Sequence, residues 1–412
     1  MANWGALVRV LMLNDYGRPV GGAELQMLAL RDGLQARGHS VRLLTSDAEL
    51  VPGQPLLSDR SCRGRTDRLQ PAAIIANRDA ARAVRTELAD FQPDIVHIRM
   101  FLWQLSPLVL PILQNVPVLF QAAVYKAICP NGMKLFPDGR SCDVSAGVAC
   151  LRSGCVSVPT WAAAMGQMAL LRRWRRHIDM AAALSPTMAQ LFAASGWPVE
   201  VLGNGVDEVA MRPRLSDPPR VAYAGRLSRE KGIVTLLEGF AAVLEQVPEA
   251  RLEIAGDGPL KEELEERAAP LGDAVRFLGH LSRPELERRF ATAWVQVVPS
   301  LWHEPFGNVT PEAMMRGTAV VASQVGGQSD IVRHEETGFL VPPGDAAALA
   351  TRLEELVTDR EAAERMGRAG RQVALTAYSR AAALDRVEAA YDRTIEAHRG
   401  KRRFGVQLAT AK

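Results

Sequence analysis

Two glutamates flank a Gly-Asn loop in the segment EPFGNVTPEAMMRG, residues 304–317. Thr310 is predicted to cap a helix and Pro311 to be its first residue, which places Glu312 in the first helical turn. Glu304 precedes this helix. Because the backbone N–H groups of a helix N-terminus attract anions, the pattern predicts one carboxylate on each side of an anion site. Taken alone, Glu312 could instead simply complement the helix dipole.

A second motif supplies two cations. The segment GRLSREKG, residues 225–232, places Arg226 and Lys231 between an expected strand and an expected helix. Two fixed cations there suit a diphosphate, since each can neutralise charge on the phosphate oxygens. Glycine turns follow four expected strands, where a ligand could approach the backbone closely: Gly21-Gly22, Gly225, Gly256–Gly258 and Gly326-Gly327.

Apolar runs and amphipathic segments alternate along both halves of the chain. Continuous apolar runs predict strands of parallel sheets covered on both faces: 8–14, 39–46, 94–98, 116–121, 221–225, 251–256, 275–279, 295–300 and 319–323. Helical periodicity predicts helices at 23–38, 232–247, 260–272 and 284–293. This alternation predicts an α/β fold of two Rossmann-like, doubly wound domains. Their ligand crevices would face each other across a cleft.

The chain divides into an N-terminal domain, residues 1–203, and a C-terminal domain, residues 204–377. The Pro-rich stretch RPRLSDPPR, residues 212–220, is predicted to link them. A last helix, 378–397, is expected to pack back on the first domain. Residues 398–412 are expected to form a flexible tail.

Composition narrows the function classes. The 412 residues are 48% hydrophobic, but no apolar run approaches the roughly 18 residues of a membrane span. The N-terminus reads as a strand rather than a signal peptide, so a cytoplasmic protein is expected. The net charge of +3 is too mild for a nucleic-acid-binding protein. The excess of Lys and Arg in residues 1–200 suits an anionic acceptor or membrane surface, although ordinary surface asymmetry explains it equally well.

Seven motifs together resemble a known family: GGAE (21–24), NGVD (204–207), GRLSREKG (225–232), AGDGPL (255–260), PSLWHEPFGNVTPEAMMRG (299–317), VVASQVGG (320–327) and TGFLVPPGD (337–345). They look like those of the retaining nucleotide-sugar glycosyltransferases of family four, which have the GT-B fold. The resemblance extends from about residue 8 to about residue 390. Glu-x7-Glu joined to Arg-x4-Lys is its most specific part.

The resemblance implies a role for each motif. Glu312 would bind the ribose of the donor nucleotide, and Glu304 would face the donor sugar. Arg226 and Lys231 would stabilise the departing diphosphate, with His97 a further catalytic candidate. Other implied donor contacts are Gly21, Gly22, Gly225, Gly256, Gly258, Phe277, Leu278, His280, Phe306, Gly307, Asn308, Val309 and Thr310.

No Asp-x-Asp motif occurs in the sequence. Many glycosyltransferases of the other major fold use that motif to hold a divalent metal at the diphosphate. Metal-independent transfer is therefore expected, with no cofactor besides the nucleotide-sugar substrate.

The chain departs from the family pattern on the acceptor side. A histidine, often followed by aspartate, commonly precedes the Tyr-x-x-x-Cys-Pro-Asn-Gly segment, but Ala123 and Val124 occupy those positions. That histidine is thought to lie near the donor sugar, so its loss puts catalysis or the acceptor position in doubt. Arg99 stands where a second histidine is usual. Together with Ala123 and Tyr125, Arg99 is a candidate for acceptor contact.

Two further features stay ambiguous. Cys129, Cys142, Cys150 and Cys155 could hold a structural zinc, but their spacing lacks Cys-x2-Cys pairs, and unligated thiols are the favoured interpretation. The basic segment LLRRWRRHID, residues 170–179, could contact an anionic membrane, but a solvated face is the safer interpretation.

Three functions follow from these observations. The leading hypothesis is a retaining glycosyltransferase that moves a sugar from a UDP- or GDP-sugar to a hydroxyl of a glycan, a lipid-linked saccharide or a small metabolite. A nucleotide-sugar epimerase is a second enzyme class on this architecture, but the N-terminal domain has few carboxylates near its motifs. A donor-binding subunit without catalysis is the third, suggested by Ala123 and Val124.

Overall fold

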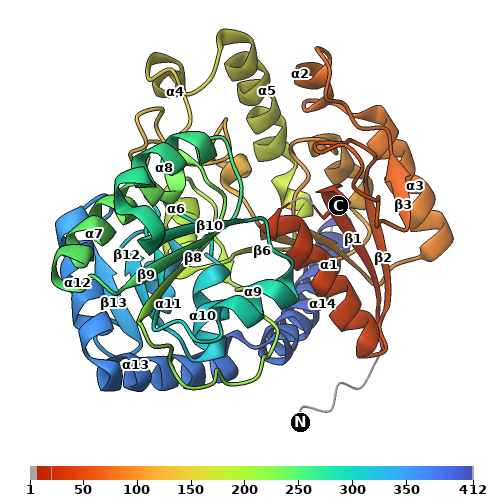
Figure 1. Cartoon of the computed structure of the whole chain (residues 1–412). Coiled ribbons are helices and arrows are strands. Elements are labelled where there is room, and N and C mark those ends of the chain that lie inside the picture. The colour runs from red at the N-terminus through yellow and green to blue at the C-terminus, as the bar shows by residue number, and fades with distance from the viewer. Residues whose placement is uncertain (1–6, 20, 411–412) are drawn as a thin grey trace.

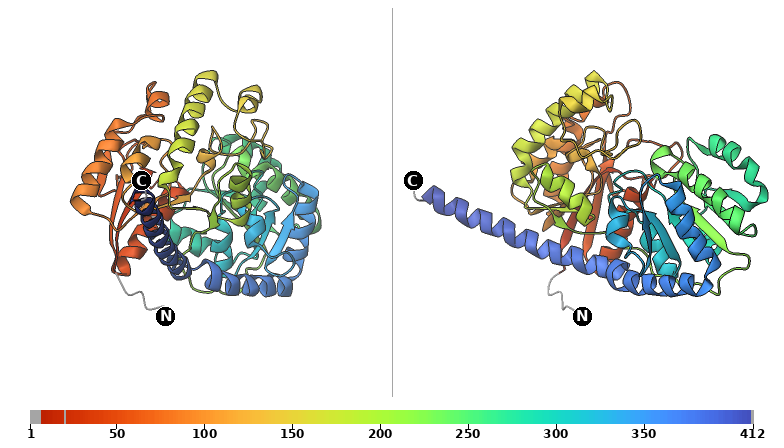
Figure 2. Two further views of the ribbon diagram at one scale, coloured as in Figure 1. Left: turned by 180° about the vertical axis from the view of Figure 1, so that it is seen from behind. Right: turned by 90° about the vertical axis from the view of Figure 1, so that its left-hand side faces the viewer.

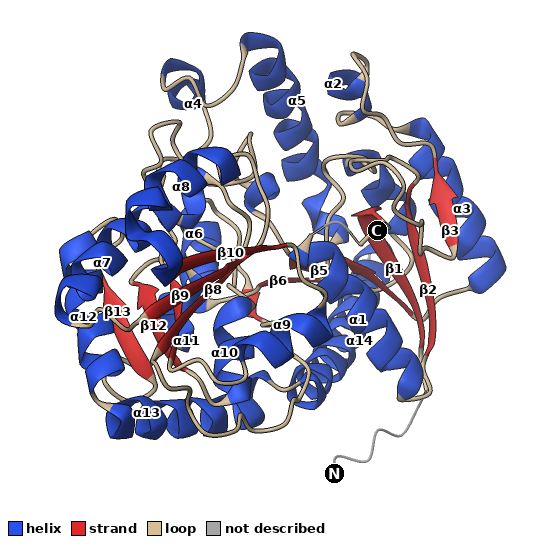
Figure 3. Ribbon diagram, in the orientation of Figure 1, coloured by secondary structure: helices blue, strands red, loops and turns tan. Residues whose placement is uncertain are grey.

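The computed structural model describes residues 7–19 and 21–410, which form two α/β domains side by side (Figure 1). Each domain is built on one parallel sheet, with strands inside and helices on both faces (Figure 3). The sequence prediction of two doubly wound domains is therefore confirmed. The strands are buried because their apolar runs face helices on both sides.

The N-terminal sheet has seven strands in the order β3-β2-β1-β4-β5-β6-β7. Its strands are β1 (Arg9–Tyr16), β2 (Ser40–Ser46), β3 (Arg60–Cys62), β4 (Ile95–Ile98), β5 (Val118–Ala122), β6 (Met180–Ala183) and β7 (Glu200–Val201). The helices of this domain are α1 (Gly22–Ala36), α2 (Gln70–Ala73), α3 (Arg78–Phe91), α4 (Val148–Arg152), α5 (Val158–Trp174) and α6 (Pro186–Ala194).

The C-terminal sheet has six strands in the order β10-β9-β8-β11-β12-β13. Its strands are β8 (Arg220–Ala224), β9 (Arg251–Ala255), β10 (Val275–Gly279), β11 (Val295–Val298), β12 (Ala319–Ser323) and β13 (Gly338–Val341). The helices are α7 (Ile233–Gln246), α8 (Lys261–Ala268), α9 (Arg283–Phe290), α10 (Val309–Arg316), α11 (Gly327–Ile331), α12 (Ala346–Thr358) and α13 (Arg360–Val373).

The chain passes between the domains at two adjacent places. The Val206 N–H donates to the Tyr378 carbonyl at 2.8 Å, and the Arg380 N–H donates to the Val206 carbonyl at 2.9 Å. The Arg380 guanidinium also contacts Asp207 at 2.8 Å. One apolar cluster then continues from α6 of the first domain into α10 and α11 of the second.

The Pro-rich stretch 212–220 does not link the domains, which corrects the sequence prediction. Arg212 is buried against the C-terminal domain, where its N–H and Nε donate to the Arg316 and Gly317 carbonyls. Leu215 belongs to the apolar core of that domain. The prolines therefore stiffen an attached segment, and the crossing lies nearer residue 206.

The last helix, α14 (Arg380–Thr410), packs against α1, β5 and β6 of the N-terminal domain. Its backbone continues through residues 398–410, where a flexible tail was expected, and its end projects beyond both domains (Figure 2). The Asp179 carboxylate contacts two side chains of this helix, His398 and Lys401, each at 3.0 Å. Residues 411 and 412 lie outside the described residues. Among the helices that the structure describes, none combines the length and apolarity of a membrane span.

Candidate active site

A cleft of about 590 Å³ lies between the domains, at the carboxyl ends of strands from both sheets. This is the edge where open α/β sheets bind ligands. Twelve of the residues singled out from the sequence line the cleft: Gly22, Arg99, Ala123, Gly225, Arg226, Lys231, Glu304, Phe306, Gly307, Asn308, Val309 and Glu312.

The centre of the cleft is an ion pair between two sequence motifs. Lys231 ends a short 3₁₀ turn after β8, and its Nζ lies 2.5 Å from the Oε1 of Glu304. Ser300 Oγ donates to the same carboxylate oxygen at 2.6 Å. Burial raises the pKa of the Glu304 carboxyl, but the Lys231 charge and these hydrogen bonds outweigh it and leave the pKa below its usual value.

Glycine allows these two loops to meet. Gly232 has a φ of +67°, and a Cβ there would lie 1.8 Å from the Pro299 carbonyl oxygen. Gly326 has a φ of +61°, and a Cβ there would lie 2.4 Å from the Glu304 nitrogen. A larger residue at Gly232 would separate the Lys231 loop from the loop that leads to Glu304, and one at Gly326 would push the loop after β12 away from Glu304.

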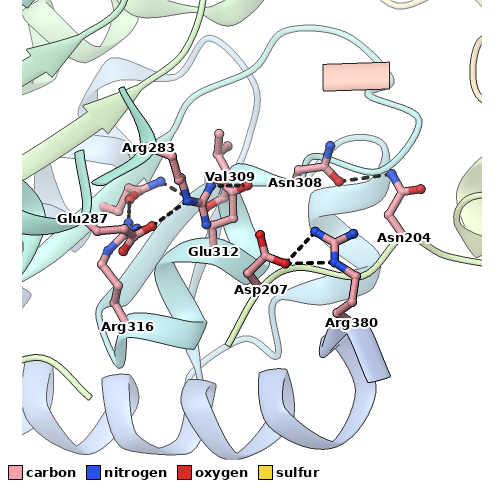
Figure 4. A network of polar contacts seen from close by, with 10 residues as sticks. Asn204, Asp207, Arg283, Glu287, Asn308, Val309, Glu312, Arg316 and Arg380 are labelled. Atoms are coloured by element: carbon pink, nitrogen blue, oxygen red, sulfur yellow. Dashed lines mark hydrogen bonds and ion pairs between the residues drawn. The ribbon is translucent and has the colours of Figure 1, made fainter. Parts of the chain in front are cut away.

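The second glutamate, Glu312, belongs to a charged network at the start of α10 (Figure 4). Arg283 contacts Glu312 at 2.5 Å and Glu287 at 2.9 Å, and Glu287 also pairs with buried Arg316. Burial raises the pKa of the Glu312 carboxyl, and the Arg283 charge opposes that rise only in part. Glu312 lines the cleft, whereas Glu287 does not, so the network ends in a carboxylate at the ligand site.

Helix α10 begins earlier than the sequence predicted. Asn308 is its N-cap and Val309 its first residue, whereas the cap was placed at Thr310. Thr310 is fully buried and its hydroxyl has no partner in the structure, so it cannot serve as the cap. Glu312 nevertheless lies in the first turn, and the helix N-terminus borders the cleft.

Of the other residues predicted to bind the donor, some line the cleft and some do not. Arg226 is exposed, lines the cleft and forms no ion pair within the described chain, so its guanidinium is available to an anion. Gly256 approaches Gly225 so closely that a Cβ would lie 1.9 Å from its carbonyl oxygen. The other candidates are not among the lining residues: Gly21, Gly256, Gly258, Phe277, Leu278, His280 and Thr310.

The N-terminal domain contributes a buried cation to the opposite wall. Arg99 follows β4 and is 3% exposed, and burial lowers its pKa to about 10. Its guanidinium donates to the Asn204 amide oxygen at 2.9 Å. The Asn204 amide in turn donates to Asn308 at 3.1 Å (Figure 4). Asn204 therefore connects Arg99, on the N-terminal wall of the cleft, to the N-cap of α10.

Sequence reasoning gave no role to Glu24 or Asn204, although both lie in motifs that it quoted. Glu24 lines the cleft from the first turn of α1, and burial raises the pKa of its carboxyl. Their positions in GGAE and NGVD were the available signal. Only the tertiary arrangement brings them together with Arg99.

Two predicted side chains lie elsewhere, which corrects their assignments. His97 has no exposed surface, and its Nδ1 lies 2.8 Å from the Tyr391 hydroxyl of α14. Burial lowers the pKa of this histidine to about 3, so it is neutral and sealed from any substrate. Tyr125 is also fully buried and packs against Phe192, so it belongs to the core rather than to an acceptor site.

The four clustered cysteines line a separate and much smaller cavity within the segment between β5 and α5. Within residues 7–19 and 21–410, no three His, Cys, Asp or Glu side chains already stand together in a metal-binding arrangement. The main cleft thus presents cations for an anionic ligand and carboxylates for hydroxyl groups.

Comparisons with known proteins agree with this geometry. Residues 21–205 match the family model "Glycosyl transferase 4-like domain", and residues 209–373 match "Glycosyl transferases group 1". A phosphatidyl-myo-inositol mannosyltransferase of Mycobacterium leprae is 29% identical over 384 residues, 88% of this chain and 91% of that protein.

Other relatives match over a shorter stretch. A glycogen synthase of Mycobacterium tuberculosis is 34% identical over 210 residues, 49% of this chain, and the match spans half of that protein's length. The Anabaena protein HepE, solved in complex with UDP and glucose, shares the fold with a TM-score of 0.65 at 18% identity. That alignment covers 93% of this chain and 99% of HepE.

Proposed function

Since the chain belongs to the glycosyltransferases of the GT-B type, we propose that it is a retaining transferase that moves a sugar from a UDP- or GDP-sugar to a hydroxyl acceptor. The observation that carries this proposal is the meeting of Lys231, Glu304 and Glu312 at one cleft. Glu312 lines the cleft, where a ribose can reach it, and Glu304 stands beside the cation for the diphosphate.

The donor's position follows from these charges. The diphosphate lies between the N-terminus of α10 and the side chains of Arg226 and Lys231. The ribose hydroxyls donate to Glu312, and the sugar hydroxyls reach Glu304 and the backbone of residues 306–308. This arrangement separates nucleotide recognition from sugar recognition.

The reaction breaks the bond between the anomeric carbon and the donor phosphate oxygen. Lys231 and Arg226 stabilise the charge that grows on the diphosphate, which lowers the barrier electrostatically. The acceptor oxygen bonds to the anomeric carbon on the face from which the diphosphate leaves, so the configuration is retained. The acceptor's proton passes to a phosphate oxygen of the leaving group. These side chains can perform the transfer without a divalent metal.

Two named relatives support the substrate class. HepE binds UDP with glucose, which favours a nucleoside diphosphate donor for this chain. The mannosyltransferase of Mycobacterium leprae acts on phosphatidyl-myo-inositol, which makes a lipid-linked acceptor one candidate beside glycans and small metabolites. Contact of residues 170–179 with an anionic membrane surface stays a prediction.

A donor-binding subunit without catalysis is the second candidate, because Ala123 and Val124 leave the acceptor wall without a histidine or carboxylate at those positions. Glu24 and Arg99 remain there to orient an acceptor. The two candidates bind the same donor but differ in turnover.

The test is incubation of the full chain with UDP- and GDP-sugars and extracts of glycans and lipids. Transfer with retained anomeric configuration, read by nuclear magnetic resonance, supports the proposal, and the Glu304→Gln variant provides the inactive control. Donor binding without transfer supports the subunit, and an isomerised free donor sugar indicates an epimerase. Inverted configuration would contradict the proposed mechanism.

A further inference from the structure

The segment between β5 and α5 holds four of the chain's five cysteines but has little regular structure. Helix α4 is its only α-helix among the described residues, and turns make up most of the rest. Cys129, Cys142 and Cys150 are buried, and Cys155 is partly exposed. From residue 130 to residue 157 no side chain belongs to an apolar core cluster of the described chain, so this stretch needs some other source of stability.

The fold of this segment brings all four cysteines to one cavity of about 10 Å³, although they are widely spaced in sequence. A bridge between Leu135 and Ser141 turns the chain back, and the Cys142 N–H then donates to the Lys134 carbonyl at 2.8 Å. The Cys155 N–H donates to the Cys150 carbonyl at 3.1 Å, which closes the other end of the segment. The tertiary structure thus brings the four cysteines together, although their spacing in the sequence argued against a zinc site.

Two buried lysines lie beside these thiols. Lys126 and Lys134 are each 2% exposed, and neither forms an ion pair in the described part of the chain. Their ammonium groups donate to the Pro130 and Val144 carbonyls. Lys126 Nζ also lies 4.0 Å from the centre of the Trp103 ring and interacts with the charge of Asp15, but four neutral thiols would add no anion beside these buried cations. A zinc ion held by four thiolates carries two negative charges and would balance both lysines.

We propose that Cys129, Cys142, Cys150 and Cys155 bind one structural Zn²⁺ as thiolates. The four thiols release their protons when they bind the ion. The sulfurs do not yet stand in a metal-binding arrangement. Zinc–sulfur bonds of about 2.3 Å would draw them to about 3.8 Å from one another. The turns between the cysteines can accommodate this closure more easily than helices or strands.

The zinc site would also support the donor-binding loops. Ser141 of the cysteine segment donates to the Leu301 carbonyl at 3.1 Å, and Gly139 lies against the Arg229 side chain. Leu301 and Arg229 flank the loops that carry Glu304 and Lys231. A bound zinc ion would therefore stabilise the contact between this segment of the N-terminal domain and the loops that carry Glu304 and Lys231.

Metal content of the purified full chain tests the proposal. We expect one zinc per chain by elemental mass spectrometry, and intense sulfur-to-metal charge-transfer absorption when cobalt replaces zinc. The Cys142→Ser and Cys150→Ser variants should lose the metal, whereas Cys62→Ser, outside the cluster, should keep it. Absence of metal after expression with zinc, or an iron–sulfur spectrum, would overturn the assignment.

A measurement on the unaltered chain covers the case in which the serine variants fail to fold. A mercurial reagent added stepwise should release the zinc as the clustered thiols react, with the zinc followed by a colorimetric chelator. Release of all zinc before these thiols react would place the metal elsewhere and overturn the proposal.

Discussion

Lys231 Nζ lies 2.5 Å from Glu304 Oε1, so the proposed cation for the diphosphate and the proposed carboxylate for the sugar contact each other in the cleft. Because the pKa of Glu304 is lowered, its carboxylate stays ionised at neutral pH. A donor must therefore share or exchange this contact, and charge growing on its diphosphate would draw Lys231 away from Glu304.

Replacing Lys231 with alanine should lower kcat by roughly 10²–10³-fold, the range for loss of one preorganised donor group. The effect on KM should be smaller, because the diphosphate charge grows in the transition state. Steady-state kinetics with the donor measures both. Lys261→Ala, outside the cleft lining, is the matched control. An effect confined to KM would contradict the leaving-group role.

Replacing Glu312 with glutamine should weaken nucleoside diphosphate binding by about 1–3 kcal/mol, the cost of losing charged hydrogen bonds to ribose. Dideoxyribose analogues, which lack those hydroxyls, should show little change. Titration calorimetry with both nucleotide types measures the difference. Glu287→Gln disturbs the same Arg283 network away from the cleft and should leave affinity unchanged. Equal losses for both nucleotides would refute ribose recognition.

His97 should make the fold sensitive to acid. Its pKa falls from 6.5 to about 3 on folding, so between these values the unfolded chain binds more protons. The free energy of unfolding therefore decreases as the pH falls below 6.5, by up to about 1.4 kcal/mol per pH unit. Asp15, whose pKa is raised to about 6, acts in the opposite direction. Both act in the unaltered chain, so a variant is needed to isolate the histidine.

Denaturant unfolding at pH 6.5 and 5 should therefore show a larger loss for the unaltered chain than for His97→Gln, by up to about 2 kcal/mol. Asp15 contributes equally to both chains and cancels. The variant should also keep most of its kcat, since His97 is sealed from the cleft. Equal pH dependence in the two chains, or a large loss of kcat, would restore a catalytic role for His97.

The sequence was informative where apolar runs are continuous. The run at 8–14 predicted β1 because its Val, Leu and Met side chains suit a strand covered on both faces. The strand β6 was missed because Met180–Ala183 is MAAA, and alanines show no strand preference. Similarly, nothing in the sequence of residues 398–410 indicated that α14 would continue there, because its contact with Asp179 is made by a residue far away in the sequence.

The donor side of the site was more predictable than the acceptor side. Lys231 and Glu304 lie in short loops whose glycines and charges are visible in the sequence. The environment of His97 depends on Tyr391, which is 294 residues away, so strand-end position alone could not reveal its burial. The Asn204–Asn308 contact likewise depends on the domains being side by side.

The last prediction concerns domain closure. Neither domain holds a complete site, because Glu304 and Lys231 come from one and Arg99 from the other. Closure around the donor would exclude water that otherwise hydrolyses it. The two chain crossings meet at Val206, where a pair of backbone hydrogen bonds and the Asp207–Arg380 contact form a compact hinge.

A nucleoside diphosphate should favour the closed state by as much as it binds that state more tightly. Small-angle X-ray scattering should then show a smaller radius of gyration at saturating UDP or GDP than without ligand. The bare nucleoside should have little effect, since it lacks the diphosphate that contacts Lys231, and the Lys231→Ala variant should respond less to UDP or GDP. Hinge motion predicts a similar loss of response when Asp207→Pro stiffens the crossing. Identical radii with and without saturating nucleotide would mean that the cleft does not close on its donor, and the two walls would then have to hold the substrates at their present separation.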